Sequence, residues 1–365
     1  MKKPAEIWRN FWFEPVSPYP LACFRIAFGL VMLVNLVGQY LPVYRYFFGP
    51  QALVPTEVVN ALKWQKLPVF DLLYWLPGDR LAQDLFLYGA ILLSIFFILG
   101  FATRISSVLL FLFLLSINNN CPIILHAGDH YARIVMLFMV FAPSGRVLSL
   151  DSLWKKDQEV DSISPTAQRM IQVQFCFIYL INWLWKLCSP IWQEGSAVYY
   201  ATRLNHYYRF DFPPFFDAPF FSYLFSWGTL FIEFALVFML FSRKARYYFI
   251  VIGVIFHLTL DFIFNLGVFE WFFIVTFLLF IDEDLFVRLK SMDIFSGFKR
   301  RKTPCVENYR LKNSPDTTNH MSYAEAERFA SLKKEPSVSG KIFLSIGIIS
   351  FFLVANLVSI SHYSQ

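Results

Sequence analysis

Charged residues are scarce in this 365-residue chain, where Asp, Glu, Lys and Arg make up 16% of the sequence against about 25% in soluble domains. Its five cysteines form no CxxC pair and no metal-ligand spacing, and its six histidines form no His-Glu-x-x-His motif. Glycine-rich phosphate loops and nucleophile elbows are also lacking. We therefore expect no metal site, and the net charge of +6 gives no reason to expect nucleic acid as a partner.

Apolar sequence, in contrast, is abundant. Hydrophobic residues make up 57% of the chain and aromatic residues 20%, including 44 phenylalanines, and they occur in long runs. About 20 consecutive apolar residues in a helix cross the hydrocarbon core of a bilayer. We predict an all-α integral membrane protein, a polytopic helical bundle of about nine transmembrane helices, with spans at 19–38, 84–101, 106–125, 130–147, 170–188, 221–241, 246–265, 268–285 and 342–361.

These spans divide the chain into three predicted parts. Residues 1–285 form a membrane domain of about eight spans, residues 286–341 a polar and basic linker, and residues 342–365 a C-terminal transmembrane anchor. No cleavage site of small residues follows the first apolar run, so we expect an uncleaved anchor in place of a signal peptide. Two stretches rich in aromatic residues and proline, 40–83 and 196–220, are expected to lie at the membrane interface.

The lysines and arginines predict an orientation. If the N-terminus lies inside and the nine spans alternate, most of the 32 basic residues fall in inside segments. This matches the positive-inside rule and places the N-terminus in the cytoplasm. The run Lys299–Lys302 in the linker is then expected to contact anionic membrane lipid. The short form of the chain favours a bacterial inner (plasma) membrane.

Lys186 stands out because it follows a very apolar segment. An ammonium group in that place is costly unless it snorkels to the interface, pairs with an anion or has a function. A lysine in a poorly hydrated pocket also gives up its proton more readily, which would make it a base. Asn182 and Tyr179 precede it on nearly the same helix face. Simple snorkelling is the alternative to a functional role.

A second polar group precedes the predicted span 130–147. His126 and His130 are four residues apart, as are Asp129 and Arg133, so each pair shares a face of any helix they form. Asp129 either pairs with Arg133 in a loop cap, or acts together with His130 in acid/base chemistry or ligand binding.

A third group, His257, Asp261 and Asn265, recurs every four residues in the span 246–265. An aspartate in an apolar helix usually faces the bundle interior or a water-filled cavity. The group therefore predicts either a functional face or hydrogen bonding between helices near the interface.

Glu233, in the span 221–241, has no charged neighbour in the sequence. It needs a proton or a partner from another span, and Arg25 and Arg133 are the candidates. Three polar clusters from different spans are predicted to lie at one depth near the outer face: Asn118–His130, Lys186 with Trp192, and Asn265–Glu270. Their common depth suggests a shared outward-opening cavity. Ordinary helix ends, where polar residues also collect, are the alternative.

At these residues the chain resembles the vitamin K-dependent gamma-carboxylase-like family, also called the horizontally transferred transmembrane (HTTM) domain family. The resemblance runs from about Pro20 to Asp284. It rests on motifs in a fixed order: Arg25, His126-Ala-Gly-Asp-His130, Phe141-Ala-Pro-Ser-Gly-Arg-Val-Leu-Ser-Leu-Asp151, Ile178-Tyr-Leu180, Lys186, Trp192-Gln-Glu-Gly195, and His257 with Gly267 and Phe269.

The resemblance implies a reaction. In carboxylases of that family, a lysine at the position resembling Lys186 deprotonates vitamin K hydroquinone. Oxygen then generates an alkoxide base that removes a proton from a substrate glutamate, and carbon dioxide traps the carbanion. The cofactor implied for this chain is a reduced isoprenoid quinone, either vitamin K hydroquinone or menaquinol, and the implied acceptor is a protein or peptide.

The resemblance also implies roles for individual residues. Lys186 would be the base, supported by acid/base or orienting groups, and His126 is an alternative to His130. The implied catalytic residues are Lys186, His130, Asp129 and His257, and the implied quinol-binding residues are Tyr179, Asn182 and Trp192.

The chain departs from the animal carboxylases in two respects. Trp185 precedes Lys186, where those enzymes have a second lysine. After Asp284 the sequence holds a polar linker and one apolar run, where those enzymes have a large lumenal β-rich domain that grips the substrate. We therefore expect a short form of the family, with a soluble partner as one way to replace that domain. The alternative function is a non-catalytic multi-pass module for transport, lipid binding or assembly.

Overall fold

The computed structural model describes residues 3–48, 52–53, 70–76, 79–120, 124–154, 162–204, 207 and 209–282. All of them belong to one compact unit, Met1–Arg288. The predicted linker 286–341 and anchor 342–365 lie outside the described residues, as does much of the stretch 40–83.

The described residues form helices and contain no β-strand, which confirms the all-α prediction. A single isolated bridge joins Val16 to Ile163. The helices are α1 (Pro4–Phe13), α2 (Tyr19–Asn35), the π-helix η1 (Leu36–Tyr40), α3 (Leu41–Phe47), η2 (Leu72–Trp75), α5 (Arg80–Leu99), α6 (Thr103–Asn120), α7 (Ala127–Phe141), α8 (Leu150–Trp154), α9 (Thr166–Leu187), α10 (Pro190–Gln193), α11 (Ala197–Ala201), η4 (Pro214–Asp217), α12 (Pro219–Met239), α13 (Arg246–Ile263), α14 (Phe269–Thr276) and η5 (Phe277–Phe280).

Five helical segments among the described residues are long and apolar enough to cross a membrane, so this is a multi-pass membrane protein. They are Tyr19–Phe47, Arg80–Leu99, Thr166–Leu187, Pro219–Met239 and Arg246–Ile263, and they match five of the nine predicted spans. The predicted spans 106–125, 130–147 and 268–285 correspond to α6, to α7 and to α14 with η5, which are shorter or more polar. The count of nine is not confirmed, because these three helices do not reach the length and hydropathy of the five and the ninth predicted span lies outside the described residues.

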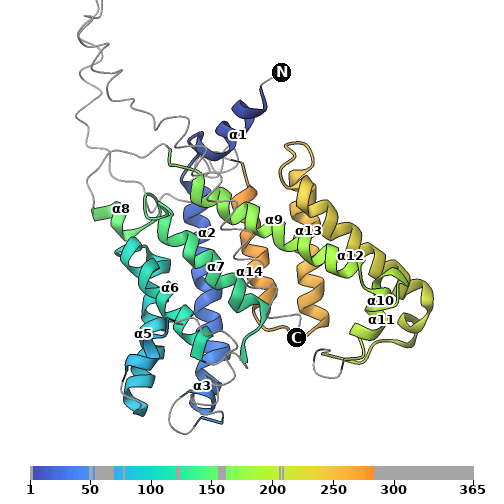
Figure 1. Ribbon diagram of the computed structural model, residues 1–365, viewed down its shortest axis with the longest axis horizontal. Helices are drawn as coiled ribbons and strands as arrows, with labels where there is room; N and C mark the ends of the chain where they lie inside the picture. Colours follow the sequence, from blue (N-terminus) through green and yellow to red (C-terminus); the bar gives the residue numbers. More distant parts are fainter. Residues whose placement is uncertain are drawn as a thin grey trace, which may run out of the picture. The chain divides into compact units, whose positions relative to one another are not determined.

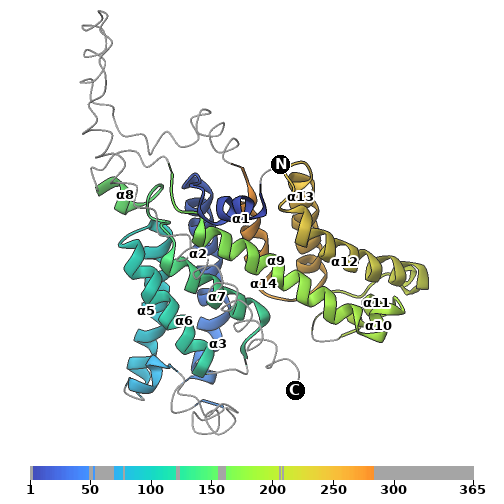
Figure 2. The same ribbon diagram turned by 45° about the horizontal axis from the view of Figure 1, so that its top comes forward.

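The helices form two groups: the first contains α2, α5, α6 and α7, and the second contains α12 and α13. Helices α9 and α14 contact both groups. In Figures 1 and 2, α5 and α6 lie on one side of α2, and α12 and α13 lie on the far side of α14. Helix α7 contacts α6 as well as α9 and α14. Helix α9 runs obliquely from its contact with α7 to a long contact with α12. Phenylalanines fill much of the interior, and the ring of Phe28 packs against that of Phe272 in a tilted arrangement with ring centroids 5.1 Å apart.

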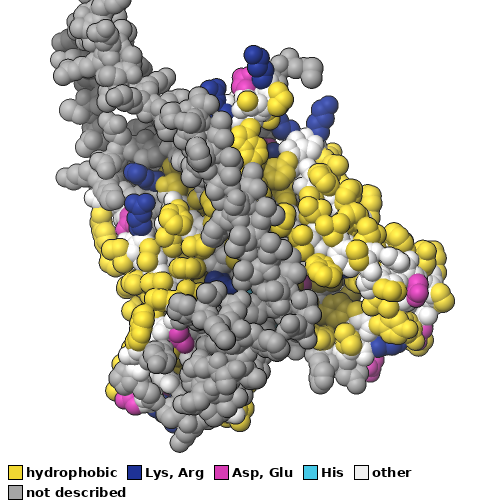
Figure 3. Space-filling view, in the orientation of Figure 1, with side chains coloured by type: hydrophobic (Ala, Val, Ile, Leu, Met, Phe, Trp, Pro, Cys, Tyr) yellow, Lys and Arg dark blue, Asp and Glu magenta, His cyan; other side chains and the backbone are white. Residues whose placement is uncertain are grey.

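Large apolar side chains cover the outer faces of the bundle. Phe231 is 68% exposed and Phe262 is 67% exposed, and Figure 3 shows hydrophobic side chains spread over the visible faces of both helix groups. Such a surface suits contact with lipid tails, where exposure of apolar groups has no cost. The lysines and arginines that are visible gather mainly toward the end of the molecule that holds the N-terminus.

A buried arginine closes one end of the first group. Arg25 of α2 is completely buried, and its guanidinium donates to the carbonyl oxygens of Ser144 (2.6 Å) and Leu148. The Asp151 carboxylate accepts from the backbone N–H groups of Ala102 and Thr103, each at 2.7 Å. Ala102 and Leu148 both have positive φ angles, 44° and 50°, a conformation that non-glycine residues hold only when surrounding contacts impose it. Much of the motif 141–151 thus has a structural explanation.

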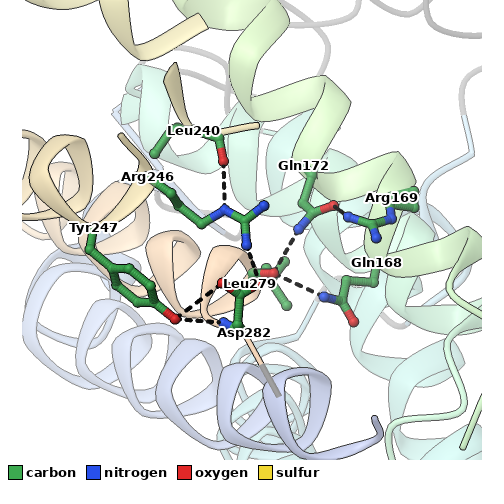
Figure 4. A network of polar contacts seen from close by, with 8 residues as sticks. All are labelled: Gln168, Arg169, Gln172, Leu240, Arg246, Tyr247, Leu279 and Asp282. Carbon is green, nitrogen blue, oxygen red and sulfur yellow. Dashed lines mark hydrogen bonds and ion pairs between the residues drawn. The ribbon is translucent and has the colours of Figure 1, made fainter. Parts of the chain in front are cut away.

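A second network fixes the beginning of α9 to the end of η5 (Figure 4). The side-chain amides of Gln168 and Gln172 donate to the carbonyl oxygen of Leu279 at 2.9 and 2.6 Å. The Arg246 guanidinium donates to Leu240 and pairs with Asp282. These bonds use carbonyl groups that helix ends leave without partners, and they set how α9, α13 and α14 converge farther along.

Candidate functional site

Helix α9 carries two candidate side chains on one face. Tyr179 and Lys186 are seven residues apart, which is close to two helical turns. Tyr179 is 2% exposed, whereas the Lys186 side chain is 26% exposed. Asn182, which lies between them, is exposed. The apolar sequence around these residues keeps α9 in the bundle and places polar groups next to α12, α13 and α14.

Lys186 pairs with a buried carboxylate. Its ammonium group contacts Oε1 of Glu233 on α12 and lies 4.9 Å from the centre of the Trp192 ring. The Glu233 side chain is 6% exposed, and its second oxygen, Oε2, is buried and has no hydrogen-bond partner among the described residues. A buried carboxylate oxygen without a donor is unfavourable, so this atom is a place where a hydroxyl group could bind.

Tyr179, His257 and Glu270 form a second buried group. The Tyr179 hydroxyl contacts Nε2 of His257, and Nδ1 of His257 contacts Oε2 of Glu270. The three residues come from α9, α13 and α14 and are 2%, 3% and 1% exposed. A phenol, an imidazole and a carboxylate that contact one another in this order can transfer a proton from one group to the next.

The two groups belong to one cluster. Glu233 interacts electrostatically with His257 and Glu270 as well as with Lys186. Tyr179 in turn interacts electrostatically with Glu233 and Glu270. Five ionisable side chains from α9, α12, α13 and α14 therefore lie together inside an apolar bundle, an arrangement that is typical of a functional site in a membrane protein. We call these five residues the buried ionic cluster.

The predicted site residues of α7 lie in a different local structure. His126 caps the helix: its Nδ1 accepts from the Gly128 N–H at 3.0 Å, and its own N–H donates to Asp129 at 3.1 Å. Asp129 also accepts from Asn35 of α2 at 3.0 Å, and His126 Nε2 lies 3.1 Å from Oε1 of Gln39 in η1. His126 and Asp129 have the three-residue spacing and the reciprocal bonds of a capping box, so part of the motif is explained by the start of α7.

His130 and Arg133 face each other, with Nδ1 of His130 3.4 Å from Nη2 of Arg133. The expected pair between Asp129 and Arg133 is therefore not formed, because the capping interactions and Asn35 take up the Asp129 carboxylate. The structure brings Lys186, Trp192, Tyr179 and His257 to the buried ionic cluster. Asp129 lies in the α7 cap and His130 beside Arg133.

Two further expectations differ from the structure. The partner of Glu233 is Lys186 and neither Arg25 nor Arg133, because the Arg25 guanidinium is used by backbone carbonyl groups. Asp261 lies 3.6 Å from Arg209 in an ion pair of its own. Asn265 does not share the face of His257, because α13 ends at Ile263.

Glu270 is the residue that the sequence did not single out. It lies in the first turn of α14, and an acidic residue at a helix start is ordinarily explained by the helix dipole. The one signal in the sequence is its position between two apolar stretches next to Gly267, close to the charge of Asp261 and the histidine at 257.

One apolar cavity lies apart from the buried ionic cluster. The described residues contain no group of three or more His, Cys, Asp or Glu side chains that could hold a metal ion. An apolar cavity of about 440 Å³ lies beside α13, lined by residues that include Phe210, Ile255 and Phe262. None of the buried ionic cluster residues lines it, so the cavity and the ionic chemistry are separate features.

The comparison with protein families gives one match: the family model for the HTTM domain matches residues 13–285. The match covers all of the helices that build the buried ionic cluster. No curated protein and no solved structure matches the chain. Since the family model spans well over half of the 365 residues, the chain belongs to the HTTM domain family.

Proposed function

We propose that the protein is a quinol-dependent enzyme of the epoxidase or carboxylase type, in which the Lys186–Glu233 pair accepts the proton of a reduced isoprenoid quinone. The observation that carries this proposal is the buried oxygen Oε2 of Glu233, which has no hydrogen-bond partner among the described residues. A quinol hydroxyl is a donor of the right kind for that atom.

The pair can hold the proton in two ways. In one, Glu233 Oε2 accepts it, and the Lys186 ammonium holds the negative charge left on the oxygen that lost it. In the other, the ion pair first becomes neutral, so that Lys186 accepts the proton at Nζ, as the family resemblance implies. A low dielectric brings the charged and neutral forms of a buried pair close in energy. Vitamin K hydroquinone or menaquinol, when bound, supplies the electrons for the reaction with oxygen.

The surroundings of the pair support this chemistry. The Trp192 ring lies 4.9 Å from Lys186 Nζ and gives an aromatic face beside the charge. The apolar surface of α12 and α13, where Phe231 and Phe262 are about two-thirds exposed, lets a membrane-dissolved isoprenoid approach from the bilayer. The acceptor would be a carboxylate of a protein or peptide, presented with or without a soluble partner. A bacterial inner membrane with the N-terminus in the cytoplasm remains the predicted setting.

Quinol oxidation by the purified protein in nanodiscs, with oxygen and bicarbonate, tests the proposal. We expect the wild type to form the epoxide and Lys186→Ala to lose at least about 10²-fold in rate, since a positioned acid or base contributes about 10²–10⁴-fold. Glu233→Gln should lose a similar factor. Lys244→Ala, which changes an exposed lysine in the turn before α13, is the matched control and should react as the wild type does.

Two results would overturn the proposal: no epoxide from folded wild-type protein with either quinol, or full activity of Lys186→Ala. Either result would favour the non-catalytic alternative, a multi-pass module for transport, lipid binding or assembly. In that case the Lys186–Glu233 pair would be a structural link between α9 and α12.

A further inference from the structure

The hydrogen atoms of the Tyr179–His257–Glu270 group can be arranged in two ways. In the first, Glu270 is ionised and accepts from Nδ1–H of His257, so that Nε2 is unprotonated and accepts from the Tyr179 hydroxyl. In the second, Glu270 is protonated and donates to Nδ1, so that Nε2–H donates to the Tyr179 oxygen. The contacts of the heavy atoms alone are the same in both.

The surroundings decide between the two arrangements. In the second, the Tyr179 hydroxyl hydrogen has no acceptor, because His257 is its one hydrogen-bond partner among the described residues. A buried donor without an acceptor costs about 1–3 kcal/mol. In the first arrangement every hydrogen has an acceptor.

We propose that Glu270 fixes His257 as the Nδ1–H tautomer and that the Tyr179–His257–Glu270 group acts as a buried proton relay. The step in which this relay accepts a proton from the Lys186–Glu233 pair rests on the proposed function. The Tyr179 O–H bond breaks as its proton moves to His257 Nε2, and the Tyr179 oxygen takes the proton held by Glu233 through one ordered water, because no hydrogen bond joins these two side chains. The net result is one proton moved from Glu233 to His257, where the imidazolium faces the Glu270 carboxylate.

The environment of His257 keeps this proton out of contact with bulk water. The rings of Phe273 and Phe277 lie 5.2 and 6.2 Å from the imidazole centre, and Phe256 lies 5.4 Å from it. The titratable groups that face it are Tyr179 from α9, Glu233 from α12 and Glu270 from α14. Two carboxylates thus stabilise a positive charge on His257. In this assignment Glu270 is a positioning residue, and it acts through His257.

The tautomer is measurable without any quinol. In protein labelled with ¹⁵N-histidine, the His257 signals are assigned by their loss in His257→Gln. At pH 8 we expect Nδ1 to be protonated and Nε2 to be unprotonated. Glu270→Gln keeps an acceptor for Nδ1–H and should keep this tautomer, whereas Glu270→Leu should lose it. A proton on Nε2 alone, or on both nitrogens throughout the accessible pH range, would overturn the assignment.

The relay itself is tested in the quinol assay. Glu270→Gln and Tyr179→Phe should each slow proton release and turnover by about 10-fold or more, because the charge or the linking hydroxyl is gone. Quinol binding should be unchanged in Glu270→Gln, since Glu270 acts through His257. Glu14→Gln, at an exposed glutamate after α1, is the matched control and should have no effect. Wild-type rates in both relay variants would overturn the relay. Absence of wild-type turnover would contradict only the proposed function, since the tautomer measurement still tests the geometry.

Discussion

Burial makes an unpaired charge expensive, so the ionisable side chains of the bundle are best understood through their partners. Lys186 has Glu233, His257 has Glu270 and Tyr179, and Arg25 has two carbonyl groups. Of these residues, only Lys186 has a side chain with appreciable exposure, at 26%. It is therefore the member of the buried ionic cluster that a molecule entering from the membrane would meet first.

At the residue scale we predict that the Lys186–Glu233 pair is strongly coupled in stability. Lys186→Met alone leaves a buried carboxylate without its counter-charge, and Glu233→Leu alone leaves the ammonium unpaired. Each should lower the free energy of unfolding by about 3–5 kcal/mol, whereas the double variant should regain most of it. Thermal unfolding in detergent measures this.

Additive losses in the double variant would contradict the coupling. Lys244→Met serves as the single-site control, since this lysine is exposed and its replacement should leave the midpoint unchanged. The rate of quinol oxidation by the double variant, compared with that of the wild type, then distinguishes a chemical role of the pair from a structural one. A stable but inactive double variant would assign the pair to chemistry, and an active one would show that it is structural.

At the scale of elements, the connection between α13 and α14 holds several parts of the site in place. Gly267 has a positive φ of 65°, and the space where its Cβ would lie is taken by the side chain of Gln39. Gln39 belongs to the π-helix η1 and contacts His126. A π-helical turn within an α-helix is frequently found at a functional site. The connection thus joins the α7 cap to the helix that carries Glu270.

We predict that Gly267→Ala disturbs both regions. The new methyl group strains the left-handed turn and displaces Gln39, which should cost about 1–3 kcal/mol in stability. The matched control is Gly228→Ala in the middle of α12, where a Cβ meets nothing within 4 Å. Alanine favours helices, so the control should be neutral or more stable by about 1 kcal/mol. Equal unfolding midpoints for the two variants would contradict the argument.

At the scale of the whole molecule, the distribution of charge predicts how the bundle lies in the membrane. The turn between α12 and α13 carries Arg243 and Lys244, and the segment after α11 carries Arg203. The alternating spans place the turn inside and the segment outside, as the positive-inside rule requires for an N-terminus in the cytoplasm.

Labelling with a membrane-impermeant maleimide tests this orientation. In a background without native cysteines, Lys244→Cys should be protected in intact spheroplasts and react only after lysis. Arg203→Cys, at a residue that is likewise exposed, should react in intact spheroplasts. The opposite pattern would mean that the bundle is inserted the other way round, and equal reactivity before lysis would contradict the predicted number of crossings between the two positions.

Much of the architecture follows from local sequence. Runs of apolar residues fixed the helices α2, α5, α9, α12 and α13, because a peptide in lipid must satisfy its backbone hydrogen bonds within the helix. The same rule leaves the number of spans open where helices are shorter or more polar, as in α6, α7 and α14. Helix α7, for example, ends at Phe141, because Ala142 precedes Pro143 and adopts an extended conformation. The carbonyl groups of Ser144 and Leu148 in the loop that follows then accept from Arg25.

The sequence by itself determined that this is a helical membrane protein and that Lys186 needs an explanation, since both conclusions depend on composition and on the cost of one charge among apolar neighbours. Only the tertiary structure decided which residues lie beside that charge and pair with it. Glu233, His257 and Glu270 come from three other helices, and a partner choice between helices depends on how they cross. No spacing along the chain records that geometry, so the buried ionic cluster could be identified only in the folded molecule.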